Sequence, residues 1–160
     1  RSVSRGLGDV YKRQPMKRYD AAEMNERLNI SVNRINGGYY IWAKRHGLQE
    51  NRLTVLYALG DGKTHTQTEI SREWLIPKTT VNTVVKKLIS EGLLKQEGND
   101  KNKPLHLTPS GEKYVNATLG SLYRAENAAL EQILDKYGDV FIKAQEEYAS
   151  ALETRLKEDV

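Results

Sequence analysis

The stretch that decides the fold runs from Thr66 to Thr108 and reads TQTEISREWLIPKTTVNTVVKKLISEGLLKQEGNDKNKPLHLT. Thr66 is followed three residues later by Glu69, the capping-box pattern in which each side chain bonds a free backbone N–H at the start of a helix. Pro77 cannot continue a preceding helix and disfavours helical geometry at the residue before it. We therefore predict a first helix that ends near Leu75 and a second that begins at about Pro77. Two short helices so close in the chain must cross at a steep angle.

The second helix of this stretch has an apolar face and several polar ones. Val81, Leu88 and either Val84 or Val85 recur at helical spacing and are predicted to be buried. The polar residues combine short hydroxyls, an amide and lysines, which suit a helix that lies in a DNA groove. An ordinary solvent-facing surface is the alternative interpretation. These residues are Lys78, Thr79, Thr80, Asn82, Thr83, Lys86 and Lys87.

A basic β-hairpin is predicted after the second helix. Gly92 ends that helix, residues 93–97 have the pattern of a strand, 98–103 that of a turn and 104–107 that of the returning strand. The tip carries Lys101 and Lys103, for which we predict contact with phosphates or with the minor groove, a solvated turn being the alternative. Two crossed helices followed by a basic hairpin predict a winged helix-turn-helix, a module that typically binds duplex DNA.

These residues resemble those of the MarR family of bacterial transcriptional regulators. The similarity is close over residues 69–81 (EISREWLIPKTTV), over Lys87-Leu88 and Glu91-Gly-Leu-Leu94, and over Leu107-Thr108 with Gly111. Three positions depart from the family pattern. Lys101 stands where the family usually has a minor-groove arginine, Pro77 replaces the common serine before the recognition helix, and Thr83 replaces an arginine within it.

Long amphipathic helices are predicted on both sides of this module. They extend from about Asp20 to Lys44, from Glu50 to Leu59, from Pro109 to about Lys136 and, after a break at Gly138, to about Glu158. Their apolar stripes are too extended for the winged module to cover, so we predict that they pack together in a two-fold dimer. Such a homodimer places two recognition helices about one turn of B-DNA (~34 Å) apart and binds a near-palindromic operator.

The predicted fold is mainly α with a small β-hairpin wing (α+β), a winged helix-turn-helix with N- and C-terminal dimerisation helices. We interpret residues 1–15 as a non-native leader, because residues 1–14 lack helical or strand periodicity and Met16 is a natural start. The predicted domains are an N-terminal dimerisation helix at 16–49, a DNA-binding domain at 50–108 and C-terminal dimerisation helices at 109–160.

Charge is distributed unevenly along the chain. The formal net charge is +4 over 160 residues, of which residues 1–14 contribute +3. Residues 62–109 carry +3, whereas residues 110–160 carry −4. Positive charge is therefore concentrated on the predicted winged module, as contact with DNA phosphates requires.

Several other classes of function are disfavoured by what the sequence lacks. The absence of cysteine excludes disulfides and thiolate zinc sites, and His46, His65 and His106 are too scattered to indicate a metal site. No phosphate-binding glycine loop, nucleophile elbow or zinc-hydrolase motif is present, so we predict neither an enzyme nor a cofactor. No apolar run of about 18 residues and no secretory signal is found, which favours a cytoplasmic protein without membrane contact.

The resemblance also implies an effector site. In the MarR family, small phenolic or other effectors bind between the dimer helices and the winged module. The aromatic residues that would line such a site here are Tyr39, Trp42, Tyr57, Tyr114 and Tyr123, with packing in the core as the alternative. Trp74 is predicted to be a core residue.

Together these features predict a homodimeric transcriptional regulator, specifically a repressor that leaves its operator when a small aromatic effector binds. The alternative is a winged-helix protein-interaction module that docks a protein partner and does not bind DNA.

Overall fold

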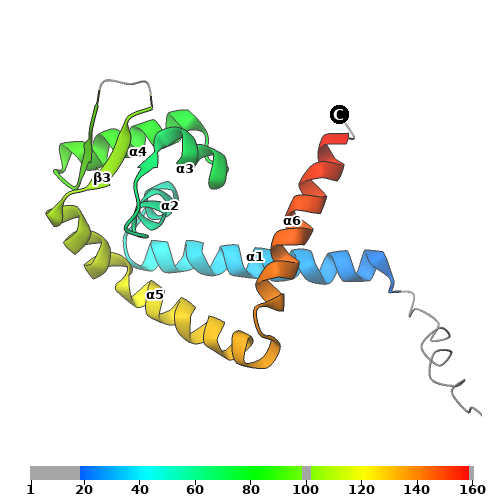
Figure 1. Cartoon of the computed structure of the whole chain (residues 1–160). Coiled ribbons are helices and arrows are strands. Elements are labelled where there is room, and N and C mark those ends of the chain that lie inside the picture. Colours follow the sequence, from blue (N-terminus) through cyan, green and yellow to red (C-terminus); the bar gives the residue numbers. More distant parts are fainter. Residues whose placement is uncertain (1–18, 99–101, 159–160) are drawn as a thin grey trace, which may run out of the picture. The chain divides into compact units, whose positions relative to one another are not determined.

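The structure is a computed structural model that describes residues 19–98 and 102–158 (Figure 1). The chain divides into two compact units, residues 1–41 and residues 42–160, which are described separately. The predicted leader at 1–15 and Lys101 at the wing tip lie outside the described residues.

Helix α1, Ala21–Arg45, supplies the described part of the first unit and continues into the second. Its start is the predicted one, because the Asp20 carboxylate accepts hydrogen bonds from the backbone N–H groups of Ala22 (2.9 Å) and Glu23 (3.3 Å). Apolar side chains remain exposed along this helix, including Ile30, Ile35 and Ile41.

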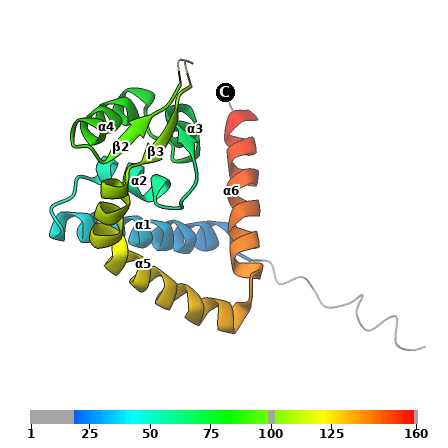
Figure 2. The same ribbon diagram turned by 60° about the vertical axis from the view of Figure 1, so that its left-hand side comes forward.

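The second unit contains the winged helix-turn-helix. Helices α2 (Glu50–Leu59), α3 (Gln67–Glu73) and α4 (Lys78–Ser90) pack together beside a small antiparallel sheet (Figures 1 and 2). The sheet has three strands in the order β1-β3-β2. Its strands are β1 (His65–Thr66), β2 (Leu94–Gln96) and β3 (Pro104–Leu107). The hairpin of β2 and β3 was predicted, whereas β1 was missed because two residues are too few to show an alternating pattern.

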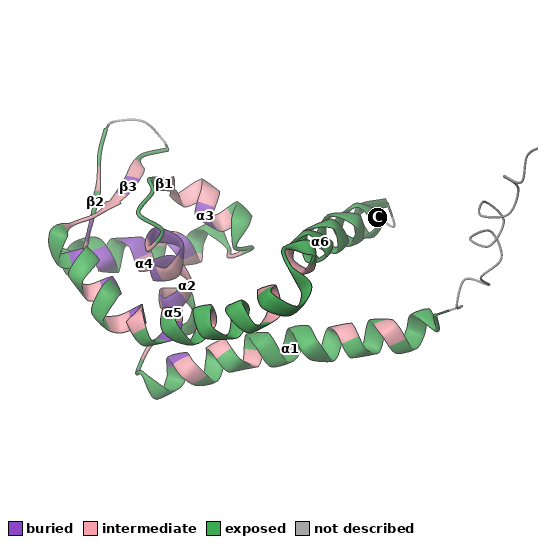
Figure 3. Cartoon of the chain, turned by 60° about the horizontal axis from the view of Figure 1, so that its bottom comes forward, coloured by how far each residue is buried: buried purple, intermediate pink, exposed green. Residues whose placement is uncertain are grey.

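The core of the second unit lies where these elements meet, seen as the buried segments in Figure 3. Helix α4 contributes Val81, Val85 and Leu88, so Val85 and not Val84 completes its predicted apolar face. The other fully buried large side chains are Val55, Leu56, Leu59, Ile70, Leu105 and Leu119.

Two further helices complete the second unit. Helix α5, Pro109–Tyr137, begins at Thr108, whose hydroxyl accepts a hydrogen bond from the Gly111 N–H (3.0 Å). It ends at Gly138, where φ is 64°, a left-handed conformation that glycine adopts without strain. Helix α6, Val140–Glu158, contains no buried residue and is exposed along most of its length (Figure 3).

The predicted fold class is confirmed: the described chain is mainly helical and carries one small antiparallel sheet. None of the helices in residues 19–98 and 102–158 is both long enough and apolar enough to cross a membrane.

The prediction for Trp74 was wrong. Ile70 is fully buried, but the side chain of Trp74 is 41% exposed. Helix α3 ends at Glu73, and Trp74 is the capping residue at which the chain leaves the helix. Its ring packs edge-on against Tyr57, with the ring centroids 5.5 Å apart, instead of entering the core.

Candidate nucleic-acid interface

The start of helix α3 is fixed by the predicted capping box. The Thr66 hydroxyl accepts a hydrogen bond from the Glu69 N–H (3.2 Å), and the Glu69 carboxylate accepts one from the Thr66 N–H (2.7 Å). The hydrogen bond from the Thr66 backbone also lowers the pKa of Glu69, because it stabilises the charged carboxylate. Thr66 belongs to β1 as well, so the cap joins α3 to the sheet.

The turn between α3 and α4 is short and strained. Leu75 has a φ of 50°, which is unusual for a residue other than glycine. Ser71 holds the turn closed: its hydroxyl donates to the carbonyl of Ile76 (2.7 Å), and its own carbonyl accepts from the Ile76 N–H (3.2 Å). Pro77 is the N-cap of α4 and offers no side-chain cap, which leaves the positive end of the helix dipole available to an anion.

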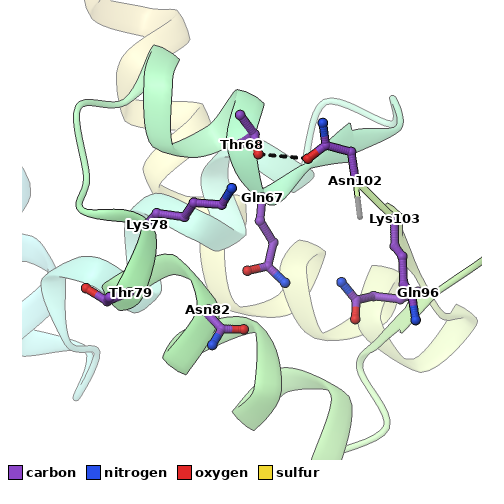
Figure 4. Close-up of a pocket in the computed structure, with 8 residues that line it drawn as sticks. All are labelled: Gln67, Thr68, Lys78, Thr79, Asn82, Gln96, Asn102 and Lys103. Carbon is purple, nitrogen blue, oxygen red and sulfur yellow. Dashed lines mark hydrogen bonds between the residues drawn. The ribbon is translucent and has the colours of Figure 1, made fainter. Parts of the chain in front are cut away.

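A groove of about 380 Å³ opens between the start of α3, the start of α4 and the wing (Figure 4). Its lining contains amides, hydroxyls and two lysines but no carboxylate, which suits contact with a polyanion that also presents hydrogen-bonding base edges. The lining residues are Gln67, Thr68, Lys78, Thr79, Asn82, Gln96, Asn102 and Lys103.

The groove brings together four of the residues predicted to contact DNA: Lys78, Thr79, Asn82 and Lys103. The other described candidates on α4 lie outside its lining. Lys86 and Lys87 are exposed, Thr80 is half-buried, and the Thr83 hydroxyl donates to the carbonyl of Thr79 (3.0 Å). Contact of any of these residues with DNA stays a prediction.

Four groove residues were not predicted from the sequence: Gln67, Thr68, Gln96 and Asn102. Thr68 and Asn102 even bond each other, the hydroxyl donating to the amide oxygen over 2.9 Å, so the start of α3 is tied to the wing (Figure 4). The two residues are 34 positions apart in the chain, and no local pattern could have paired them.

Glu97, an acidic residue of the wing, is paired with neighbouring basic residues. The carboxylate of Glu97 lies 2.7 Å from the Lys95 ammonium and 3.7 Å from the His106 ring nitrogen. The hydrogen bond from Lys95 lowers the pKa of Glu97, so the carboxylate stays charged and paired. Glu97 therefore does not leave an unpaired negative charge at this position of the wing.

The predicted effector residues fall into separate clusters. Tyr57 and Tyr123 lie together, with ring centroids 5.6 Å apart, and Trp74 joins them through its contact with Tyr57. The Tyr57 hydroxyl donates to the Glu126 carboxylate over 3.1 Å. Burial, followed by the nearby Glu126 charge, raises the pKa of Tyr57 to about 12. The Tyr123 hydroxyl is buried and has no hydrogen-bond partner among the described residues.

The remaining aromatic candidates lie elsewhere. Tyr114 and Tyr123 lie on opposite flanks of the buried stripe of α5, because nine residues correspond to about two and a half helical turns. It contacts Arg52 instead. Trp42 stacks on His46 with centroids 4.0 Å apart, and Tyr39 belongs to the first unit. An effector pocket formed by these residues therefore stays a prediction.

Comparison with known proteins agrees with this geometry. Residues 46–103 match the model of the MarR family. This matched segment covers α2, the helix-turn-helix and most of the wing. No curated protein matches the sequence.

Solved structures extend the similarity beyond the matched segment. A MarR family regulator from Neisseria meningitidis is 24% identical with a TM-score of 0.68, over 84% of this chain and 97% of that one. NadR in complex with 4-hydroxyphenylacetate is 15% identical with a TM-score of 0.62, over 87% and 97%. Staphylococcus aureus MarR in complex with salicylate and kanamycin is 22% identical with a TM-score of 0.58, over 86% and 95%. Residues 46–103 are thus similar to the MarR family of transcriptional regulators, and the fold is similar to that of solved MarR family proteins.

Proposed function

We propose that the protein is a homodimeric, sequence-specific regulator that binds duplex DNA in the cytoplasm and represses transcription from a near-palindromic operator. The observation that carries this proposal is the groove between α3, α4 and the wing, whose lining includes two lysines and no carboxylate. The lysines contact phosphates, while the amides and hydroxyls on α4 contact base edges in the major groove.

The dimer is supported by the exposed apolar face of α6. Tyr148, Leu152 and Leu156 recur at helical spacing, and their side chains are 41%, 42% and 60% exposed. A helix of 19 residues gains little stability from its own hydrogen bonds in water and depends on burial of such a face. A second copy of the chain supplies that burial, and two-fold symmetry then pairs two recognition helices with two half-sites.

The experiment that tests DNA binding is selection of bound sequences from a random duplex pool, followed by titration of the selected duplex at several salt concentrations. A near-palindromic consensus and a linear fall of log affinity with log salt are expected, because phosphate contacts release counterions. No detectable binding to any duplex at low salt would contradict the proposal and favour the protein-interaction module.

Asn82→Ala is expected to weaken binding to the selected operator by about 1–3 kcal/mol and binding to random duplex much less, since an amide pairs with adenine at two atoms. Lys103→Ala is the matched control on the other wall of the groove. It should weaken binding to the operator and binding to random duplex equally, because a lysine contributes mainly charge. Competition binding on both duplexes measures the difference. Equal losses on both duplexes for Asn82→Ala would mean that the amide contacts only the DNA backbone.

Release of DNA by a small aromatic effector is the second part of the proposal. A ligand releases DNA only if it binds more tightly to a dimer whose recognition helices no longer match adjacent major grooves. The cluster of Tyr57, Tyr123 and Trp74 supports a site for a planar molecule, since it combines half-exposed rings with a buried hydroxyl that lacks a partner among the described residues. Two similar folds have been solved with 4-hydroxyphenylacetate and with salicylate.

Addition of salicylate or 4-hydroxyphenylacetate to a Trp42→Phe protein is expected to quench the remaining Trp74 fluorescence and to weaken operator binding. Tyr57→Phe should reduce both responses, because it removes the hydroxyl that bonds Glu126. The exposed Tyr137 provides the control, and Tyr137→Phe should leave both responses unchanged. If a broad panel of aromatic compounds alters neither signal, the rings serve only to pack α2 against α3 and α5.

A further inference from the structure

A polar cluster outside the groove joins helices α2, α4 and α5. The Arg52 guanidinium, from α2, makes two hydrogen bonds to the carboxylate of Glu91, at 3.2 and 2.6 Å. It also donates to the Tyr114 hydroxyl of α5 over 3.3 Å and lies 5.4 Å from the centre of the Tyr114 ring. The Arg52 side chain is only 14% exposed, so this is not an ordinary surface ion pair.

Each charge of the pair lies at the unfavourable end of its own helix. Arg52 is in the first turn of α2, near the positive end of that helix dipole. Glu91 is the C-cap of α4, near the negative end of the recognition helix. The helix dipole alone would favour an acidic residue at position 52 and a basic residue at position 91. Residues that break a local rule are commonly retained for a requirement set elsewhere in the molecule.

That requirement is the position of the recognition helix. The N-terminal end of α4 is held by the turn closed by Ser71 and Ile76, and its C-terminal end is held by the bonds of Glu91 to Arg52. Helix α2 contacts both α4 and α5 (Figures 1 and 2). Arg52 bonds both neighbours at once. A bidentate guanidinium–carboxylate pair fixes orientation as well as distance.

We propose that Arg52 is a positioning residue that ties the C-terminal end of α4 to α5, so that displacement of α5 changes the placement of the recognition helix. The inference rests on the proposed function, because it assigns to this cluster the link between the dimer arm and the DNA-binding face. The bound molecule is the operator itself, and Arg52 determines which spacing of half-sites the dimer accepts.

The test compares two duplexes: the selected operator and the same operator with one base pair inserted between its half-sites, which moves one half-site by about 3.4 Å. The ratio of the two dissociation constants measures how strictly the recognition helices are placed. Arg52→Met keeps most of the unbranched stem of the side chain and removes the guanidinium with its hydrogen bonds to Glu91 and Tyr114. We expect it to reduce this ratio by about tenfold, the scale of coupling through packed networks.

Three further variants separate placement from charge and from folding. Glu91→Gln removes a negative charge and on electrostatic grounds alone would tighten DNA binding, whereas placement predicts the same loss of spacing preference as in Arg52→Met. The double variant should lose no more spacing preference than Arg52→Met alone, because Arg52→Met already removes the ion pair with Glu91. Arg72→Met is the matched control, since Arg72 contacts Glu73 in an exposed pair at 3.4 Å. This variant should weaken binding to both duplexes equally and leave the ratio of dissociation constants unchanged.

The outcomes are distinct. An unchanged ratio in folded Arg52→Met or, should that variant not fold, in Glu91→Gln would overturn the inference while leaving DNA binding intact. Absence of duplex binding by the unmodified protein would overturn the proposed function and the inference with it. A reduced ratio in both variants, with the control unchanged, supports the positioning role.

Discussion

Leu152→Glu is expected to convert the dimer to monomers and to lower operator affinity by about a hundredfold or more. Leu152 lies on the apolar stripe of α6 that is exposed in the single chain. In the proposed dimer a glutamate there is buried without a partner, and an uncompensated buried charge costs about 3–5 kcal/mol. The two-fold axis introduces the substitution twice, once in each protomer. Light scattering at micromolar concentration measures the molecular mass, and titration of the selected operator measures the affinity.

Ser150→Glu is the matched control for this substitution. Residues two apart in a helix point about 200° away from each other, so Ser150 faces away from the stripe that contains Leu152. The control adds the same charge to the same exposed helix and should leave the protein dimeric. A Leu152→Glu protein that remains dimeric and binds its operator normally would exclude α6 from the interface.

Gly111→Ala is expected to lower the free energy of unfolding by about 3 kcal/mol, near the upper end of the usual range for single substitutions. Gly111 is buried in the first turn of α5, and a Cβ atom there would collide with the carbonyl oxygen of Leu93. That oxygen cannot move freely, because it accepts a hydrogen bond from the Thr108 N–H (3.1 Å) at the base of the wing. Urea unfolding measures the effect.

Gly120→Ala provides the comparison in the same helix. A Cβ at Gly120 would meet only the Arg124 side chain, at an ordinary contact distance of 3.5 Å. Replacing a glycine inside a helix by alanine then stabilises the fold by about 0.5–1 kcal/mol. A similar stability for the two variants would show that the backbone at Leu93 yields without cost.

Local chemistry made much of this fold predictable. The capping box of Thr66 and Glu69 fixed the start of α3, and the hairpin pattern located β3 at Pro104–Leu107. The helix α2 was predicted at Glu50–Leu59, the range that the structure shows. In each case the signal lies within a few residues of chain, since caps, turns and apolar spacing act over one or two helical turns.

The candidate site was only partly predictable. Lys78, Thr79 and Asn82 stand out because they share one short helix with a recognisable apolar face. Gln67 and Asn102 do not, because their role depends on α3 and the wing approaching the same groove. Trp74 was predicted to be a core residue, but the end of α3 at Glu73 turns it outward.

The sequence by itself determined the order of the helices and most of their bounds, the presence of the wing and the concentration of basic residues on the winged module, whereas the end of α3 lies at Glu73 and not near Leu75 as predicted. The tertiary structure alone decided which distant residues meet: Thr68 with Asn102, Tyr57 with Tyr123, and Arg52 with Glu91 and Tyr114. The physical reason is that helix and turn formation respond to near neighbours in the chain. The members of these pairs are 34 to 66 residues apart, and they meet only when separate elements pack on one core.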